Sequence, residues 1–356
     1  MITAGNSCTL DVTFTPQAPG LRVGAVEIFS GGSLVSSTPI YGVGQGPEIA
    51  FNSGFPAPVD LGNNSLSMPV AVDAAGNIYV TASGALLKKT SGGLQTLSSG
   101  SLSGGTDSLA VDGAGNVFVA DNEQGRVFEV PANGGTPTGV YPASGSSVPR
   151  GIAVDGGGNL FVADSQNNEV VEVPANGGAQ TVVFGPPSSA IIQSVAVDGA
   201  GDVFVALNSP GSVVEIPAGC TNSSCQIPVG TGWNTPSSLA VDAAGDLFVA
   251  DPGLAGGNGQ IIEVPPGCKN TNCQVLLADG NTQNFGVNSY GLAVDGQGNV
   301  FYVNVDSNTQ GQGTGFGQLY EIPRSQGSVN LGVVSENFQS SDTPLLVQNI
   351  GCLLYT

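Results

Sequence analysis

The sequence contains no histidine and only seven lysine and arginine residues. Without histidine, the chain cannot build a Ser-His-Asp or Cys-His catalytic arrangement, and it lacks a ligand that most protein zinc sites use. The 27 acidic residues outnumber the seven basic ones and give a net charge of -20. Phosphate binding requires clustered basic side chains, so we expect no nucleic-acid partner.

Long apolar runs are also missing. No uninterrupted run approaches the ~18 apolar residues of a membrane-spanning helix, so we expect no membrane insertion. Glycine and proline are frequent, with 55 and 23 residues, or about a fifth of the chain. This share is below the ~25–30% typical of low-complexity sequence. The glycines instead recur at regular intervals, which indicates turns in a repeated fold.

One sequence frame occurs six times. It reads Ala-Val-Asp, two residues, Gly, then Asn or Asp and an apolar run, and successive copies are 39 to 53 residues apart. A period near ~40–45 residues with several short strands per copy is typical of propeller blades. The aspartates of the six copies are Asp73, Asp112, Asp155, Asp198, Asp242 and Asp295.

The third copy illustrates the strands that each repeat predicts. Residues 152–154, 160–163, 170–173 and 181–184 are short apolar segments separated by turn residues. Asp155 can accept backbone N–H groups in the first turn, where glycine supplies a positive φ. Four antiparallel strands form a blade that cannot bury both faces alone, whereas a ring of six blades does so.

The copies resemble NHL repeats, in which an apolar-Ala-Val-Asp strand is followed by Gly-Asn and a strand ending in Val-Ala-Asp. Val119-Ala120-Asp121, Val162-Ala163-Asp164 and Val249-Ala250-Asp251 match the last element, and copies one, four and six depart from it. The resemblance implies an all-β, six-bladed β-propeller over residues 47–327. NHL modules include ligand-binding propellers and a few enzymes, so the fold leaves function open.

The ends of the chain differ from the repeats. The N-terminal segment, from Cys8 to Pro16 with the strands that follow, resembles the closing half of Ig-like domains of the choice-of-anchor D (ASPM/Hydin-like) type. The C-terminal segment resembles the opening of another such domain, at residues 329–334 and 346–351. We therefore expect partial Ig-like β-sandwich segments at residues 1–46 and 328–356, in a module cut from a longer chain. Residues 57–62 would then supply the outer strand of the last blade and close the ring.

The six cysteines favour disulfides over metal binding. Cys220 and Cys225, and Cys268 and Cys273, occupy equivalent turns of the fourth and fifth repeats, and neither pair has further Cys or His ligands nearby. We predict a hairpin disulfide in each turn, and no partner for Cys8 or Cys352. Disulfides point to an extracellular protein, secreted or on the cell surface.

The repeated aspartates admit a calcium interpretation, because they are oxygen donors next to glycines. They recur once per blade around the ring and so cannot converge on one ion. We expect them to cap their own turns, as we also expect of Asp121, Asp164 and Asp251. The prediction is therefore no cofactor, with calcium as the alternative.

The loops opposite the Asp-Gly-Asn hairpins vary in sequence and length, which favours them as a recognition surface. In each copy, one residue lies three positions before the alanine of the Ala-Val-Asp frame. Together these residues should surround the channel mouth on that face. From this ring and from the only tryptophan we select the ligand-binding candidates Asp107, Arg150, Gln193, Trp233 and Tyr290. For Trp233 the alternative is packing between blades, and for Arg150 it is pairing with an acid such as Asp107.

These patterns lead to one functional prediction and two alternatives. Because no catalytic set is recognisable, we predict a non-enzymatic extracellular binding, adhesion or scaffold module, monomeric, with an unknown protein or carbohydrate ligand. The alternatives are a calcium-dependent lactonase or hydrolase of the six-bladed class, and a purely structural spacer.

Overall fold

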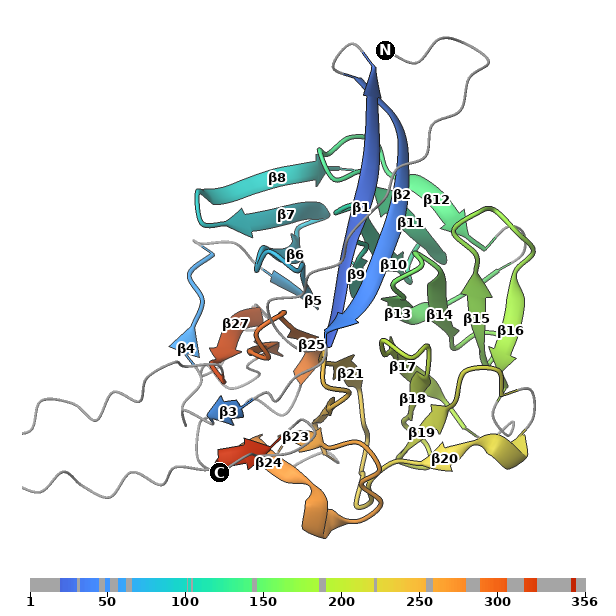
Figure 1. The fold of residues 1–356 in the computed structure, drawn as a ribbon, viewed down its shortest axis with the longest axis vertical. Coiled ribbons are helices and arrows are strands. Elements are labelled where there is room, and N and C mark those ends of the chain that lie inside the picture. The colour runs from blue at the N-terminus through green and yellow to red at the C-terminus, as the bar shows by residue number, and fades with distance from the viewer. Residues whose placement is uncertain are drawn as a thin grey trace, which may run out of the picture.

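The computed structural model describes residues 20–30, 33–44, 49–51, 57–61, 66–100, 102–103, 105–142, 146–185, 190–220, 223–253, 259–279, 289–305, 317–324 and 347–349. Residues 57–324 of this set form six antiparallel blades arranged in a ring (Figure 1). The predicted all-β, six-bladed propeller is thereby confirmed.

Each blade contains four strands. Blades one to three consist of β5 (Leu66–Val72), β6 (Ile78–Ala82), β7 (Ala85–Thr90) and β8 (Gly93–Ser99); β9 (Thr106–Val111), β10 (Val117–Asp121), β11 (Arg126–Val130) and β12 (Thr138–Tyr141); and β13 (Pro149–Val154), β14 (Leu160–Asp164), β15 (Glu169–Val173) and β16 (Thr181–Phe184). Blades four to six consist of β17 (Ile192–Val197), β18 (Val203–Leu207), β19 (Ser212–Ile216) and β20 (Ile227–Pro228); β21 (Ser238–Val241), β22 (Leu247–Asp251), β23 (Gln260–Val264) and β24 (Val275–Asp279); and β25 (Ser289–Val294), β26 (Val300–Val305), β27 (Gly317–Ile322) and β4 (Ala57–Pro58). Two short 3-10 helices, η1 (Ser223–Cys225) and η2 (Thr271–Cys273), precede β20 and β24.

The hydrophobic core lies between blades rather than at one centre. The second strands of blades one to five are buried along their whole length, because a neighbouring blade covers each face. Six clusters of buried apolar side chains each join two adjacent blades, so the ring has one core per blade interface. The β-branched and aromatic residues of these strands suit such pleated, covered surfaces.

The ring closes through a strand from before the first blade. In β4, Ala57 pairs with Glu321 and Pro58 with Tyr320 of β27, and the backbone N–H of Val59 donates to the Leu319 carbonyl over 2.9 Å. Leu61 then packs into the core shared by blades six and one. The segment therefore occupies the position expected for a closing strand, and its pairing protects the edge of β27.

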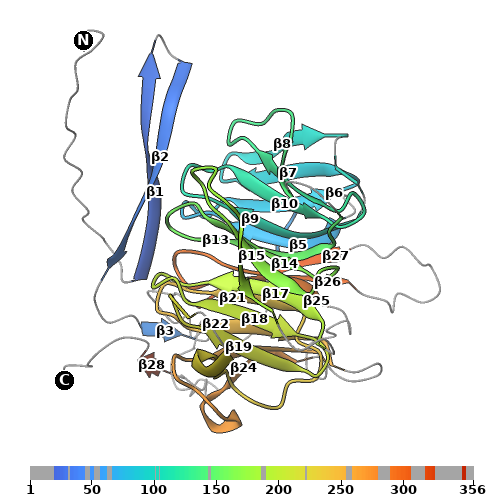
Figure 2. The same cartoon turned by 90° about the vertical axis from the view of Figure 1, so that its right-hand side faces the viewer.

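Among the described residues, four strands lie outside the propeller. β1 (Gly20–Ser30) and β2 (Ser33–Gly44) form an antiparallel hairpin, which stands beside the ring of blades in Figure 2. β3 (Ile49–Phe51) pairs with β28 (Val347–Asn349), so segments from the two ends of the chain meet. This pairing was not anticipated from the sequence. The predicted strands at 329–334, and Cys8 and Cys352, fall outside the described residues.

Candidate functional site

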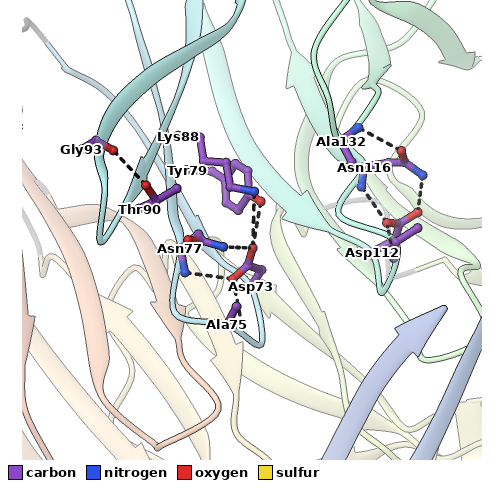
Figure 3. Close-up of polar contacts among 11 residues, drawn as sticks. Asp73, Ala75, Asn77, Tyr79, Lys88, Thr90, Gly93, Asp112, Asn116 and Ala132 are labelled. Atoms are coloured by element: carbon purple, nitrogen blue, oxygen red, sulfur yellow. Dashed lines mark hydrogen bonds and ion pairs between the residues drawn. The ribbon is translucent and has the colours of Figure 1, made fainter. Parts of the chain in front are cut away.

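The repeated Asp hairpins are structural turns. In Figure 3, Asp73 Oδ1 accepts the backbone N–H groups of Ala75 and Asn77, and its Oδ2 accepts from the Asn77 side chain over 2.8 Å. The other five frame aspartates also accept the N–H four residues later, over 2.8–2.9 Å. The expectation that these carboxylates cap their own turns is confirmed.

The aspartates that end the second strands are also structural. Asp121, Asp164 and Asp251 are almost fully buried and hold the loop that enters their blade. Asp164, for example, accepts the Val148 backbone N–H over 3.1 Å and the Tyr141 hydroxyl over 2.8 Å. Desolvation acts to raise the pKa of Asp164, but these hydrogen bonds outweigh it and leave the pKa below its ordinary value. Such a carboxylate is a poor proton acceptor.

Four of the five candidate ligand-binding residues stand at β-bulges in the innermost strands. The pairing of inner and second strands skips Asp107 in β9, Arg150 in β13, Gln193 in β17 and Tyr290 in β25. These strands are neighbours around the ring, and the bulges lie near the start of each strand, whereas the Asp hairpins follow its end. Bulges redirect side chains and are common beside active sites. The channel mouth therefore carries the same special backbone position in four blades.

Asp107 and Arg150 are two charged groups among the described residues of this mouth. The Asn122 side-chain amide donates to Asp107 Oδ2 over 2.6 Å, and Arg150 Nε donates to Ser165 Oγ over 3.1 Å. Burial raises the pKa of Asp107, while the Asn122 hydrogen bond and the Arg150 charge partly oppose that rise. The carboxylate is thus partly desolvated beside a fixed cation.

The predicted alternative for Arg150 was a simple ion pair with an acid. Within the described residues the ion pairs are Lys88–Asp73 and Arg324–Glu263, and neither involves Arg150. Ser165 holds one edge of the guanidinium instead. Sequence reasoning missed Asn122 and Ser165. Their signal was available, because each directly follows the Val-Ala-Asp end of a second strand.

Below the mouth, the channel narrows to a cavity of about 30 Å³ whose lining includes Asp107 and three serines, Ser108, Ser194 and Ser238. Ser108 Oγ accepts the Ile152 N–H, and Ser194 Oγ accepts the Leu239 N–H, so these serines join adjacent blades. A space of this size is large enough to hold water.

Trp233 has internal contacts. Its ring packs on the core between blades four and five, close to Gly230, and its Nε1 donates to the Val229 carbonyl over 2.8 Å. These contacts correspond to the packing alternative. Gln193 is half-buried in β17, and the Tyr290 side chain lies outside the described part of the structure, as do residues 254–258 and 306–316 of the two long loops.

The described residues of the mouth do not form a calcium site. Calcium binds six to eight oxygen ligands, usually including several carboxylates. Across the described ranges, no three Asp, Glu, Cys or His side chains are grouped closely enough to hold a metal. Asp107, a carboxylate in the described part of the mouth, already accepts a hydrogen bond from the Asn122 side chain. We therefore assign no reaction step to a metal.

The two predicted disulfides, Cys220–Cys225 and Cys268–Cys273, are present. Disulfides of this kind are consistent with an extracellular protein. Within the described segments, no helix combines the length and apolar character needed to cross a membrane.

Solved structures with the same fold include several enzymes. A streptogramin B lyase has a TM-score of 0.53 and 11% identity, over 78% of this chain and 98% of that one. A putative gluconolactonase has a TM-score of 0.53 and 12% identity, over 78% and 92% of the two chains. The PQQ-bound aldose sugar dehydrogenase of Streptomyces coelicolor has a TM-score of 0.52 and 15% identity, over 79% and 99%. No protein-family model and no curated protein matches the chain.

These similarities establish a β-propeller, since identities this low show the fold alone. They also contradict the prediction that the chain is not an enzyme, because the neighbouring structures are described as a lyase, a gluconolactonase and a dehydrogenase. That prediction was wrong because it treated the lack of histidine as a lack of catalysts. A variant of the Staphylococcus aureus virginiamycin B lyase with one histidine changed to alanine is described as catalytically inactive. This chain has no histidine and cannot place that side chain at the corresponding position.

Proposed function

We propose that this propeller is a metal-independent hydrolase for small lactones or esters, with its active site at the channel mouth. The observation that carries the proposal is the position of a partly desolvated carboxylate, Asp107, within the electrostatic influence of the Arg150 guanidinium, with both residues at bulges in the inner strands of adjacent blades. The likeness to a putative gluconolactonase and a lyase supports a propeller enzyme.

Asp107 is the proposed general base. Burial raises the pKa of Asp107, and a carboxylate with a raised pKa is a stronger proton acceptor than an exposed one. Asn122 fixes the orientation of Asp107 by its hydrogen bond to Oδ2. Asp107 would take a proton from water as that water attacks the acyl carbon, and the proton would then pass to the leaving alkoxide oxygen.

Arg150 is the proposed binding group for developing negative charge. Its Nε donates to Ser165 Oγ, so the two terminal nitrogens are the donors that we assign to the substrate. The acyl oxygen becomes an oxyanion during attack, and the product of lactone hydrolysis is a carboxylate. A guanidinium stabilises both, and in a chain of net charge -20 it is one of few groups able to do so.

Substrates should be small and hydroxylated, a class that includes sugar-derived lactones. The amide of Gln193 at the third bulge can bind hydroxyl groups, and the cavity beneath the mouth is small, at about 30 Å³. We further propose that the repeats are of the NHL type, that residues 1–46 and 328–356 belong to Ig-like modules, and that the protein acts as an extracellular monomeric unit.

The test is acid release from a panel of aliphatic, aromatic and sugar lactones, measured with and without EDTA. We expect turnover of at least one lactone, insensitive to the chelator. Asp155→Asn on the hairpin face is the control, because its carboxylate only caps a turn. Turnover that EDTA abolishes would contradict a metal-independent site. Asp107→Asn should lose activity while Asp155→Asn keeps it, and an equal loss of activity in both variants would indicate unfolding.

A further inference from the structure

Four of the six hairpin turns are completed by an asparagine. Asn77, Asn116, Asn159 and Asn299 each donate from Nδ2 to Oδ2 of the frame aspartate over 2.8–2.9 Å. In blades two, three and six the asparagine Oδ1 also accepts an N–H from the turn after the third strand: that of Ala132, Ala175 or Arg324. Both aspartate oxygens are thereby satisfied by neutral donors.

Blade five breaks this pattern twice. Asp246 replaces the asparagine, and Pro266, which has no N–H, replaces the alanine that follows the third strand. The backbone geometry is retained, since the Asp246 N–H still donates to Asp242 Oδ1 over 2.9 Å. A carboxylate at 246 has no amide hydrogens, and Asp242 Oδ2 is buried without a hydrogen-bond partner in the structure. Two carboxyl groups therefore occupy the place of an Asp–Asn pair.

The Asp242–Asp246 pair lies in an almost fully buried environment that contains one positively charged side chain, Arg324. Asp242 is 8% exposed, Glu263 of β23 is fully buried, and Arg324, which follows β27, is 2% exposed. Arg324 Nη2 donates to Glu263 Oε1 over 2.7 Å, and its guanidinium lies 4.9 Å from the centre of the Phe248 ring. Glu263 is therefore the carboxylate that contacts the Arg324 guanidinium directly. Asp242, Asp246, Glu263 and Arg324 are the charged groups that face one another here.

We propose that Asp242 and Asp246 share one proton in the folded protein, and that this proton makes the contact between blades five and six sensitive to pH. Three ionised carboxylates against one guanidinium would leave two net negative charges in a buried cluster, which is strongly unfavourable. A single proton between Asp246 and Asp242 Oδ2 supplies the hydrogen that asparagine supplies in four other blades. Neighbouring carboxyl groups commonly hold one proton in this way.

The sign of the pH dependence follows from the direction of the pKa shifts. Burial raises the pKa of Asp242 above its ordinary value of 3.8, and the Arg324 charge only partly opposes this rise. Burial also raises the pKa of Glu263. A group whose pKa is raised by folding stabilises the fold fully below its unfolded pKa and loses that contribution as pH rises through the folded pKa. The cluster therefore stabilises the propeller in acid and weakens it as pH increases.

The test compares Asp246→Asn with wild type by thermal unfolding between about pH 4 and 8. The amide at 246 should donate to Asp242 as in the other blades, raising the unfolding midpoint near pH 8 by about 2–4 °C and flattening its pH dependence. The matched control is Asp202→Asn in blade four. Its Asp198–Asp202 pair borders an open groove of about 240 Å³, so a smaller change is expected.

Two further measurements keep the proposal testable if Asp246→Asn folds poorly. Asn116→Asp would build the same pair in blade two, and its unfolding midpoint should fall as pH rises. The infrared spectrum of wild type near neutral pH should show a buried protonated carboxyl that Asp246→Asn lacks. A midpoint lowered equally at all pH values in Asp246→Asn would show that an ionised Asp246 supports the cluster. That result, or the absence of a protonated carboxyl in wild type, would overturn the proposal.

Discussion

Asn122 Nδ2 donates to Asp107 Oδ2 over 2.6 Å, across the first two strands of one blade. This hydrogen bond lowers the pKa of Asp107 against the effect of burial, which raises it. If Asp107 is the base, kcat/KM must fall as the carboxylate becomes protonated. The midpoint of this acid limb should therefore lie at a pH above 3.8, the ordinary pKa of an aspartate.

Asn122→Ala should move that acid limb to higher pH, because it removes one of the two interactions that favour the ionised form. At pH values above the limb, the rate should recover most of its wild-type value. The measurement is kcat/KM between about pH 4 and 9. A limb that does not move would show that a different group titrates.

Arg150→Lys should lower kcat by about tenfold with a smaller effect on KM, since the oxyanion forms only during attack and an ammonium keeps the charge but cannot reproduce the planar fork. Because the charge is retained, the acid limb should stay in place. In Arg150→Gln the limb should move to higher pH, since the Arg150 charge lowers the pKa of Asp107. Steady-state kinetics of both variants over the pH range separate the effect of the guanidinium shape from that of its charge. If the pH profiles of both variants are identical to that of wild type, the role assigned to Arg150 is refuted.

Gly151→Ala should destabilise the ring by about 1–3 kcal/mol or more. A β-carbon at Gly151 would lie 2.6 Å from Ser194 Cα in the neighbouring inner strand. This clash is with a backbone atom, so the two strands would have to move apart. Gly185→Ala is the control, because its β-carbon would meet nothing within 4 Å. Urea unfolding of both variants checks this, and equal stabilities would mean that the inner strands are less closely packed.

Trp233→Ala should lower the free energy of unfolding by about 2 kcal/mol and leave kcat/KM unchanged. The partly buried ring fills space between blades four and five, and its N–H is used by Val229. Denaturant unfolding together with the lactone assay distinguishes the two roles. Lost turnover at full stability would instead place Trp233 in the active site.

The sequence was sufficient to predict the propeller because the decisive interactions are local. Asp155 and Asn159 lie four residues apart, so their turn chemistry is visible in a single repeat. The disulfides of blades four and five each join cysteines five residues apart and were predictable for the same reason.

The candidate site was only partly predictable. The ring position identified Asp107 and Arg150, but the bulges that carry them depend on the pairing register between strands. The contact of Trp233 depends on how two blades pack. The contact of Arg324 with Glu263 joins residues 61 positions apart, so nothing local revealed the buried cluster in blade five.

The most direct test of the proposed function is the ratio of kcat/KM for wild type and Asp107→Asn on the best lactone, near pH 7 and with EDTA present. Removing a general base costs about 10²–10⁴-fold in rate. We predict a loss in that range, with an unfolding midpoint close to that of wild type. A folded Asp107→Asn variant with undiminished kcat/KM would contradict a carboxylate-based active site at the channel mouth.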